Sequence, residues 1–276
     1  MNAIEIKGLY KRYKDFAIED LNLELPMGCI LGLIGDNGAG KTTTIKLILG
    51  MLRKDGGTIT VLGQDDPKAI PKEDIGVVLD DVGIPGCLNV RQVGNVMAST
   101  FRNWNQERYE GYLRQFALPE KKQFKDFSKG MKMKLGIAVA LSHDAKLLIL
   151  DEATSGLDPV VRDEILDLFQ EFTRDETHSI LISSHIVSDL EKICDYVAFV
   201  HKGRLLLCEE KDRLREEYAI VHCTEGDLAR FPEIVGKKKT AYAVEAIVKK
   251  EWIPAGMAQS AIDIEQLFIF MAKEAG

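Results

Sequence analysis

The sequence predicts an α/β fold, because short apolar segments alternate with segments of helical periodicity along much of its 276 residues. A helical block at about residues 89–141 interrupts this alternation. One apolar segment, residues 29–34, runs directly into a glycine-rich loop and then into a helix. These three features predict an α/β core that is divided by a helical insertion and followed by a tail.

Before the insertion, short β-rich segments predict strands at residues 3–6, 17–25, 29–34, 58–62 and 75–79. A helix is expected at residues 41–49, after the glycine-rich loop. Asn89 is a suitable N-cap for the first helix of the insertion.

After the insertion, the sequence again predicts alternating elements. They are a strand at 147–150, a helix at 160–173, a strand at 179–183, a helix at 186–194 and a strand at 196–200. From about Glu209 onward the chain is more charged and less regular, and it ends in an amphipathic segment at 264–273. We therefore expect a less regular tail with one helix near its end.

Composition and charge exclude several classes of protein. Hydrophobic residues make up 46% and charged residues 29% of the chain, which is typical of a folded globular protein. A net charge of -7 argues against a nucleic-acid binder that relies on bulk positive charge. No apolar run approaches the roughly 18 residues of a membrane span, and the start lacks the pattern of a signal peptide. Five scattered cysteines without C-x-x-C spacing indicate reduced thiols in the cytosol.

The glycine-rich loop matches the phosphate-binding pattern G-x-x-x-x-G-K-[ST]. It consists of Gly35, Asp36, Asn37, Gly38, Ala39, Gly40, Lys41 and Thr42, and Thr43 follows it. Backbone N–H groups of such a loop close around phosphate oxygens, and the helix that follows points its positive end at them. We expect Lys41 to reach the β- and γ-phosphates of a nucleotide and the Thr42 hydroxyl to bind Mg²⁺. The core is therefore expected to be that of a P-loop NTPase.

A pair of carboxylates follows the predicted strand at residues 147–150. In P-loop enzymes, a buried strand that ends in aspartate brings a carboxylate beside the metal, so Asp151 is expected to hold Mg²⁺. Glu152 is then the candidate general base that polarises the attacking water.

Further motifs in the same order resemble the ATP-binding subunits of ABC transporters, over roughly residues 3–215. Residues 153–159, which include Asp158, look like the D-loop of that family, and the segment Phe127-Ser128-Lys129-Gly130-Met131 resembles its L-S-G-G-Q signature. His185 follows a strand at the position of the family's switch histidine. Tyr13 lies where the family stacks an aromatic ring on adenine.

The resemblance implies an ATPase with an antiparallel β subdomain and an inserted helical subdomain, which works as a head-to-tail dimer. Each ATP would lie between the phosphate loop of one subunit and the signature of the other, where Ser128 and Gly130 face the γ-phosphate. His185 would donate a hydrogen bond to the γ-phosphate. The implied partners are integral-membrane transporter subunits and a second ATP-binding subunit, identical or different, and no nucleic acid. The implied location is the cytoplasmic face of the cell membrane, reached through the partners.

Three positions depart from the family's pattern. Asp80 stands where the family has a glutamine that contacts Mg²⁺, and we still expect it in the metal site. Lys129 replaces the first signature glycine, and Met131 replaces the signature glutamine. Substitutions of this kind resemble the exporter branch.

The expected organisation is an ATP-binding domain at residues 1–215 with a helical subdomain at about 82–142, followed by a small extension at 216–276. As a hypothesis, residues 82–116 receive a helix of the membrane subunit.

The alternative function is a non-transport ATPase of the same family that acts on nucleic acid or ribosomes. The ATPases of this family that act on nucleic acid need a long coiled coil between the phosphate loop and the signature. No sustained heptads occur between Lys41 and Ser128, which argues against this class. The ribosome-associated relatives carry two cassettes in one chain. Only one Gly-Lys-Thr loop occurs in this sequence, which argues against that class as well.

Overall fold

A computed structural model of the protein describes residues 1–66, 68–240 and 243–274. Its largest sheet has the strand order β5-β6-β7-β3-β8-β9. The strands are β5 (Ile75–Val78), β6 (Leu147–Asp151), β7 (Ser179–Ser184), β3 (Ile30–Ile34), β8 (Tyr196–His201) and β9 (Arg204–Glu210). The first five of this order pair in parallel, and β9 pairs antiparallel with β8. β9 was not among the expected strands; it is a mostly half-buried hairpin partner of β8.

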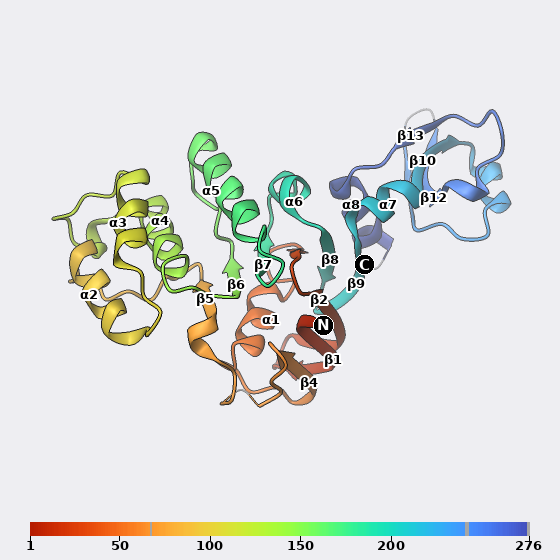
Figure 1. Cartoon of the computed structure of the whole chain (residues 1–276). Helices are drawn as coiled ribbons and strands as arrows, with labels where there is room; N and C mark the ends of the chain where they lie inside the picture. The colour runs from red at the N-terminus through yellow and green to blue at the C-terminus, as the bar shows by residue number, and fades with distance from the viewer. Residues whose placement is uncertain (67, 241–242, 275–276) are drawn as a thin grey trace.

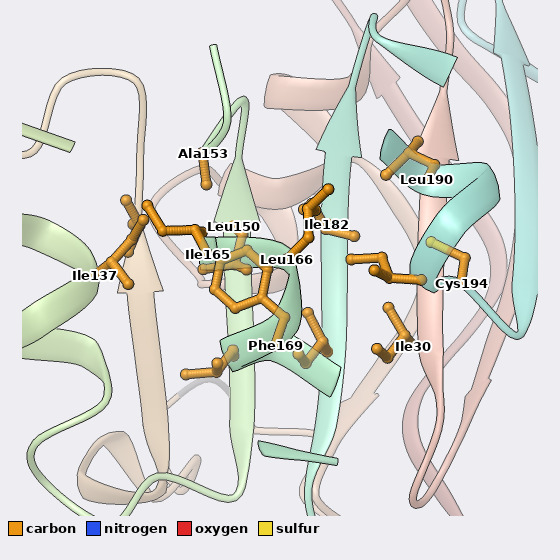
Figure 2. Close-up of a cluster of buried hydrophobic side chains, with 14 of the residues drawn as sticks. Ile30, Ile137, Leu150, Ala153, Ile165, Leu166, Phe169, Ile182, Leu190 and Cys194 are labelled. Atoms are coloured by element: carbon orange, nitrogen blue, oxygen red, sulfur yellow. The ribbon is translucent and has the colours of Figure 1, made fainter. Parts of the chain in front are cut away.

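Both faces of this sheet are covered, which explains why β3, β6 and β7 are buried along their whole length. One face packs against helix α1 (Lys41–Ile48) and the strands of a second sheet. The other face packs against α5 (Pro159–Phe172) and α6 (Val187–Ile193). Figure 2 shows side chains from both helices meeting those of the sheet.

The second sheet confirms the predicted antiparallel β subdomain. It has the order β2-β1-β4, formed by β2 (Ala17–Pro26), β1 (Asn2–Arg12) and β4 (Gly56–Val61). Both pairings are antiparallel. Their buried side chains share one cluster with α1, so this sheet and α1 cover the same face of the large sheet.

The predicted helical insertion is confirmed between β5 and β6. Its helices are α2 (Val90–Thr100), α3 (Gln106–Gln115) and α4 (Lys129–Ala140). Asn89 caps α2 as expected: its side chain accepts from the backbone N–H of Gln92, and the Gln92 side chain accepts from the Asn89 N–H. In Figure 1 these helices group at one side of the molecule, while the tail lies at the opposite side.

The expectation of a less regular tail is wrong. A four-stranded antiparallel sheet follows α7 (Lys211–Glu217), in the order β11-β12-β10-β13. The strands are β11 (Gly236–Lys239), β12 (Val244–Lys249), β10 (Tyr218–Cys223) and β13 (Gln259–Ala261). The outer strands β11 and β13 are short and mostly exposed, so backbone pairing rather than an apolar pattern defines them. The final helix, α8 (Ile264–Glu274), agrees with the predicted amphipathic segment.

Short 3₁₀ helices complete the described elements: η1 (Lys72–Asp74), η2 (Phe124–Asp126), η3 (Glu225–Arg230) and η4 (Lys250–Trp252).

We predict that Phe169→Ala lowers the free energy of unfolding by about 3–5 kcal/mol, because it leaves a cavity between α5 and the sheet. Phe169 is fully buried in the cluster that joins them (Figure 2). Urea unfolding followed by far-UV circular dichroism measures the change. Gln170→Ala, at an exposed position of the same helix, is the control and should shift the value by less than about 0.5 kcal/mol. Equal midpoints for the two variants would contradict the described packing.

Candidate active site

The predicted phosphate loop joins strand β3 to helix α1 and turns sharply through residues 35–40. Gly38 and Gly40 have φ angles of 82° and 114°, in the left-handed region that other residues disfavour. A Cβ on Gly40 would also lie 3.0 Å from Cζ of Phe16. The loop therefore depends on glycine at these two positions.

Lys41, the first residue of α1, has only 6% of its side chain exposed. Its Nζ donates to the carbonyl oxygens of Gly35 at 2.7 Å and Asp36 at 3.3 Å. The same Nζ lies 3.6 Å from Oε1 of Glu152. A buried ammonium requires such oxygen partners, because removing a charge from water is unfavourable. Lys41 thus links the phosphate loop to the carboxylate pair.

The two carboxylates differ in their surroundings although they are adjacent in sequence. Asp151, the last residue of β6, is buried, and its Oδ1 accepts from the Ser183 hydroxyl at 2.5 Å. Its other oxygen, Oδ2, is buried and has no hydrogen-bond partner among the described residues. Glu152 has a φ of 54°, so the chain turns there, and its N–H donates to the carbonyl oxygen of Ser183 at 3.1 Å. The turn sends the Glu152 side chain toward Lys41 rather than along the strand.

His185 lies just beyond β7 and contacts the same glutamate. Its Nδ1 lies 2.6 Å from Oε2 of Glu152. Half of the His185 side chain is exposed, whereas the Glu152 side chain is mostly buried. The two oxygens of Glu152 therefore face Lys41 and His185 respectively.

These groups border a cleft of about 750 Å³. The predicted site residues that line it are Asp36, Asn37, Gly38, Gly40, Lys41, Thr42, Thr43, Asp80, Glu152 and His185. The predicted residues that do not line it are Tyr13, Gly35, Ala39, Ser128, Gly130, Asp151 and Asp158. Asp15, Phe16, Lys129 and Ser155 line the cleft although the sequence analysis did not assign them to the site.

An aromatic ring lies at the cleft, but it belongs to Phe16 and not to Tyr13. The ring centroids of these two residues are 6.4 Å apart, and Tyr13 is exposed beside Lys11. Phe16 also packs close to Gly40 of the phosphate loop. Phe16 directly precedes β2. Because aromatic residues are common in strands, the sequence alone did not distinguish Phe16 as a residue of the cleft.

Three predicted site residues outside the cleft lining make local contacts at the starts of helices: Ser128, Gly130 and Asp158. The Ser128 side chain caps α4 by accepting from the Met131 N–H at 3.3 Å. Asp158 caps α5 in the same way. A Cβ on Gly130 would lie 3.2 Å from the carbonyl oxygen of Gly156, so the start of α4 adjoins the loop after Glu152.

A second, apolar groove of about 470 Å³ lies between the core and the helical insertion. Met51 and Val77 from the core and Met97 and Phe101 from the insertion are among its lining residues. Met51 and Val77 are among the exposed large hydrophobic residues of the chain. His143 also lines the groove, where its ring stacks on Phe101, and burial lowers the pKa of His143. The groove therefore presents a mostly apolar surface, with Lys72 and His143 among its few polar lining residues.

Across residues 1–66, 68–240 and 243–274, no helix combines the length and the apolar character that spanning a bilayer requires.

Comparisons with known proteins agree with this architecture. The family model described as ABC transporter matches residues 18–155. The lantibiotic transport ATP-binding protein SrtF of Streptococcus pyogenes is 34% identical over 213 residues, which cover 76% of this chain and 91% of that protein. The bacitracin transport ATP-binding protein BcrA of Bacillus licheniformis is 36% identical over 209 residues, which cover 74% of this chain and 68% of that protein.

Solved structures share the fold. A structure described as the ATP binding subunit of an ABC transporter has a TM-score of 0.70 and 29% identity, with 77% of this chain and 92% of that chain covered. The ATP-binding cassette MJ0796, solved as a dimer bound to ADP and Pi, has a TM-score of 0.66 and 18% identity, with 75% and 98% covered. The expected P-loop NTPase fold, with its β and helical subdomains, is thereby confirmed. The chain belongs to the ABC transporter family.

Proposed function

We propose that this chain is the subunit that binds and hydrolyses ATP to power a membrane ABC transporter of the exporter type. The observation that carries the proposal is the position of Glu152, between Lys41 of the phosphate loop and His185, at one cleft. The two relatives reported above are named for lantibiotic and bacitracin transport, which agrees with the resemblance to the exporter branch.

In this proposal the phosphates of ATP bind at the start of α1. Backbone N–H groups from Asp36 to Gly40, with the positive end of α1, provide the electrostatic match for a triphosphate. Lys41 then exchanges its carbonyl partners for phosphate oxygens, and Thr43 extends the binding surface along the helix. Phe16 offers its ring to adenine, with Tyr13 beside it.

Oxygens at the cleft, together with those of Asp151 next to Glu152, fit a Mg²⁺ ion that would bind with the phosphates. Asp151 has a buried oxygen without a hydrogen-bond partner in the part of the chain that the structure describes, and Thr42 and Asp80 line the cleft. Hydroxyl and carboxylate oxygens are ligands that Mg²⁺ prefers, and it completes its shell with phosphate and water. We propose these three residues as the metal site. Bound Mg²⁺ would neutralise charge that develops on the phosphates.

Glu152 acts as the general base in this proposal. One of its oxygens accepts a proton from the attacking water, while Lys41 and His185 fix the orientation of the carboxylate. A protonated His185 donates from Nδ1 to Glu152 and from Nε2 to a phosphate oxygen. The same histidine would thus hold the base and sense the phosphate that leaves.

We propose a head-to-tail dimer in which a second ATP-binding subunit completes each site. The arrangement of Ser128, Gly130 and Asp158 supports this, because Gly130 adjoins the loop after Glu152 and none of the three lines the cleft of its own chain. The MJ0796 cassette, which has the same fold, is described as dimeric. ATP would favour the closed dimer, and hydrolysis would remove that preference.

The apolar groove is the proposed docking site for an integral-membrane subunit, which would hold the chain at the cytoplasmic face of the membrane. Contiguous exposed apolar surface of this kind is typical of interaction sites. The groove is bordered by the helical insertion, which agrees with the hypothesis for residues 82–116. We assign the ATPase to residues 1–215 and an accessory role to residues 216–276, whose sheet starts at β10.

The first test is Lys41→Ala, which should weaken binding of a fluorescent ATP analogue at least about 30-fold, because the phosphates lose their buried cationic partner. Fluorescence titration measures the Kd. Lys46→Ala on the same helix, outside the cleft lining, is the control and should bind normally. Unchanged affinity in Lys41→Ala would refute the assignment of the phosphate loop.

Glu152→Gln should bind ATP and slow phosphate release by about 10²-fold or more, since the amide cannot accept the proton. A phosphate-release assay measures turnover, and Glu164→Gln, an exposed glutamate of α5, is the control. Light scattering of Glu152→Gln with Mg-ATP should show a dimer. Turnover close to normal would assign the base to another group, and a monomer that binds ATP would contradict self-association.

Met51→Asp should shift the tagged chain from the membrane fraction to the soluble fraction of its own cells, because a charge in the groove opposes apolar docking. Its ATP affinity should not change, since Met51 does not line the ATP cleft. Ile269→Asp on α8, another exposed apolar residue, is the matched control. If Met51→Asp stays in the membrane fraction as firmly as the control, the groove is not the docking site.

A further inference from the structure

Two charged residues at the cleft, Lys129 and Asp80, form a close ion pair. Nζ of Lys129 lies 2.6 Å from Oδ1 of Asp80. Lys129 is the first residue of α4, and Asp80 lies just beyond the end of β5. Both line the same cleft as Lys41 and Glu152. The pair thus connects the helical insertion to the central sheet beside the proposed phosphate site.

The aliphatic part of Lys129 passes over the loop that follows Glu152. A Cβ on Gly156 would lie 3.6 Å from Cδ and 3.8 Å from Cγ of Lys129. Gly156 has a φ of 76°, so this turn favours glycine, and the lysine packs against its open side. Lys129 therefore reaches Asp80 across one wall of the cleft.

The neighbouring carboxylate, Asp81, is turned toward its own loop. Its Oδ1 accepts from the N–H of Gly83 at 3.3 Å, and it does not line the cleft. Of the two adjacent aspartates, Asp80 is thus the one that faces the cleft, and Lys129 engages one of its oxygens. Asp80 and Lys129 are also two of the positions at which the sequence departs from its family's pattern.

The ion pair is close but easily broken. The side chain of Lys129 is 54% exposed and that of Asp80 is 58% exposed. Water screens such a pair, so its contribution is small and a stronger partner for Asp80 displaces the lysine. A divalent cation is such a partner, because it carries twice the charge and binds carboxylate oxygens directly.

We propose that Lys129 is a positioning residue that competes with Mg²⁺ for Asp80 and so sets how tightly the cleft holds Mg-ATP. The proposal rests on the proposed function. While Lys129 holds Oδ1 of Asp80, that oxygen is not available to the metal, and the side chain is oriented toward the lysine. When Asp80 binds Mg²⁺ instead, the ion pair with Lys129 breaks. The start of α4 then loses this contact with the segment that follows β5. Metal binding is thereby linked to the position of the helical insertion.

The test is Lys129→Gln, titrated with a fluorescent ATP analogue in Mg²⁺ and again in EDTA. Removing the competitor should lower the Kd in Mg²⁺ about two- to five-fold, the range of an exposed ion pair, and leave the Kd in EDTA unchanged. Lys134→Gln is the matched control, because it removes the same charge from α4 at a residue that does not line the cleft. Thermal melting should be alike for all variants.

Asp80→Asn and the double variant with Asp80→Asn and Lys129→Gln complete a double-mutant cycle. In the Asp80→Asn background, Lys129→Gln should have no further effect on the Kd in Mg²⁺, because the contested carboxylate is gone. A Kd in Mg²⁺ that is unchanged or raised by Lys129→Gln would overturn the proposal, as would equal effects in both backgrounds. A wild-type chain that binds no nucleotide would instead refute the proposed function itself.

Discussion

The site depends on one constraint, which is that parallel strands bring their carboxyl ends to the same edge of a sheet. β3 pairs with β7 and β7 with β6, so Ile34 lies opposite Ser184, and Asp151 lies opposite Ser183. The phosphate loop, the carboxylate pair and His185 each follow one of these strand ends. Because the strands are buried throughout, the positions of these groups are fixed by the packing of the core.

Adjacent carboxylates can then take different surroundings. Asp151 continues the strand and is buried against Ser183, whereas the left-handed backbone at Glu152 turns the next side chain toward Lys41. Such a backbone is unfavourable by about 1–3 kcal/mol for a residue with a side chain, and it persists only where its surroundings enforce it. Here the hydrogen bond from the Glu152 N–H to Ser183 does so. The proposed roles of metal ligand for Asp151 and general base for Glu152 are thereby separated, although the two residues are adjacent in sequence.

Local signals in the sequence were sufficient for much of this structure. The phosphate loop is contiguous, and Asp151 follows an uninterrupted apolar strand, so both could be recognised without tertiary contacts. Phe16 and the contact between Lys129 and Asp80 could not, because they depend on how separate segments pack. The tail sheet was missed for a related reason: strands such as β11, with three consecutive lysines, are defined by their hydrogen-bonded neighbours. The helices of the insertion, by contrast, showed their periodicity and the Asn89 cap directly.

The position of β3 in the sheet has a consequence for how the chain is made. Its partners, β7 and β8, begin at Ser179 and Tyr196, far downstream in the sequence. A ribosome therefore releases β3 long before either neighbour exists, and this strand consists of apolar residues and one glycine. Unpaired apolar strands of this kind are exposed to aggregation, and long-range parallel pairing is slow to form. The nucleotide site thus cannot assemble until synthesis has passed β7 and β8, well over half of the chain.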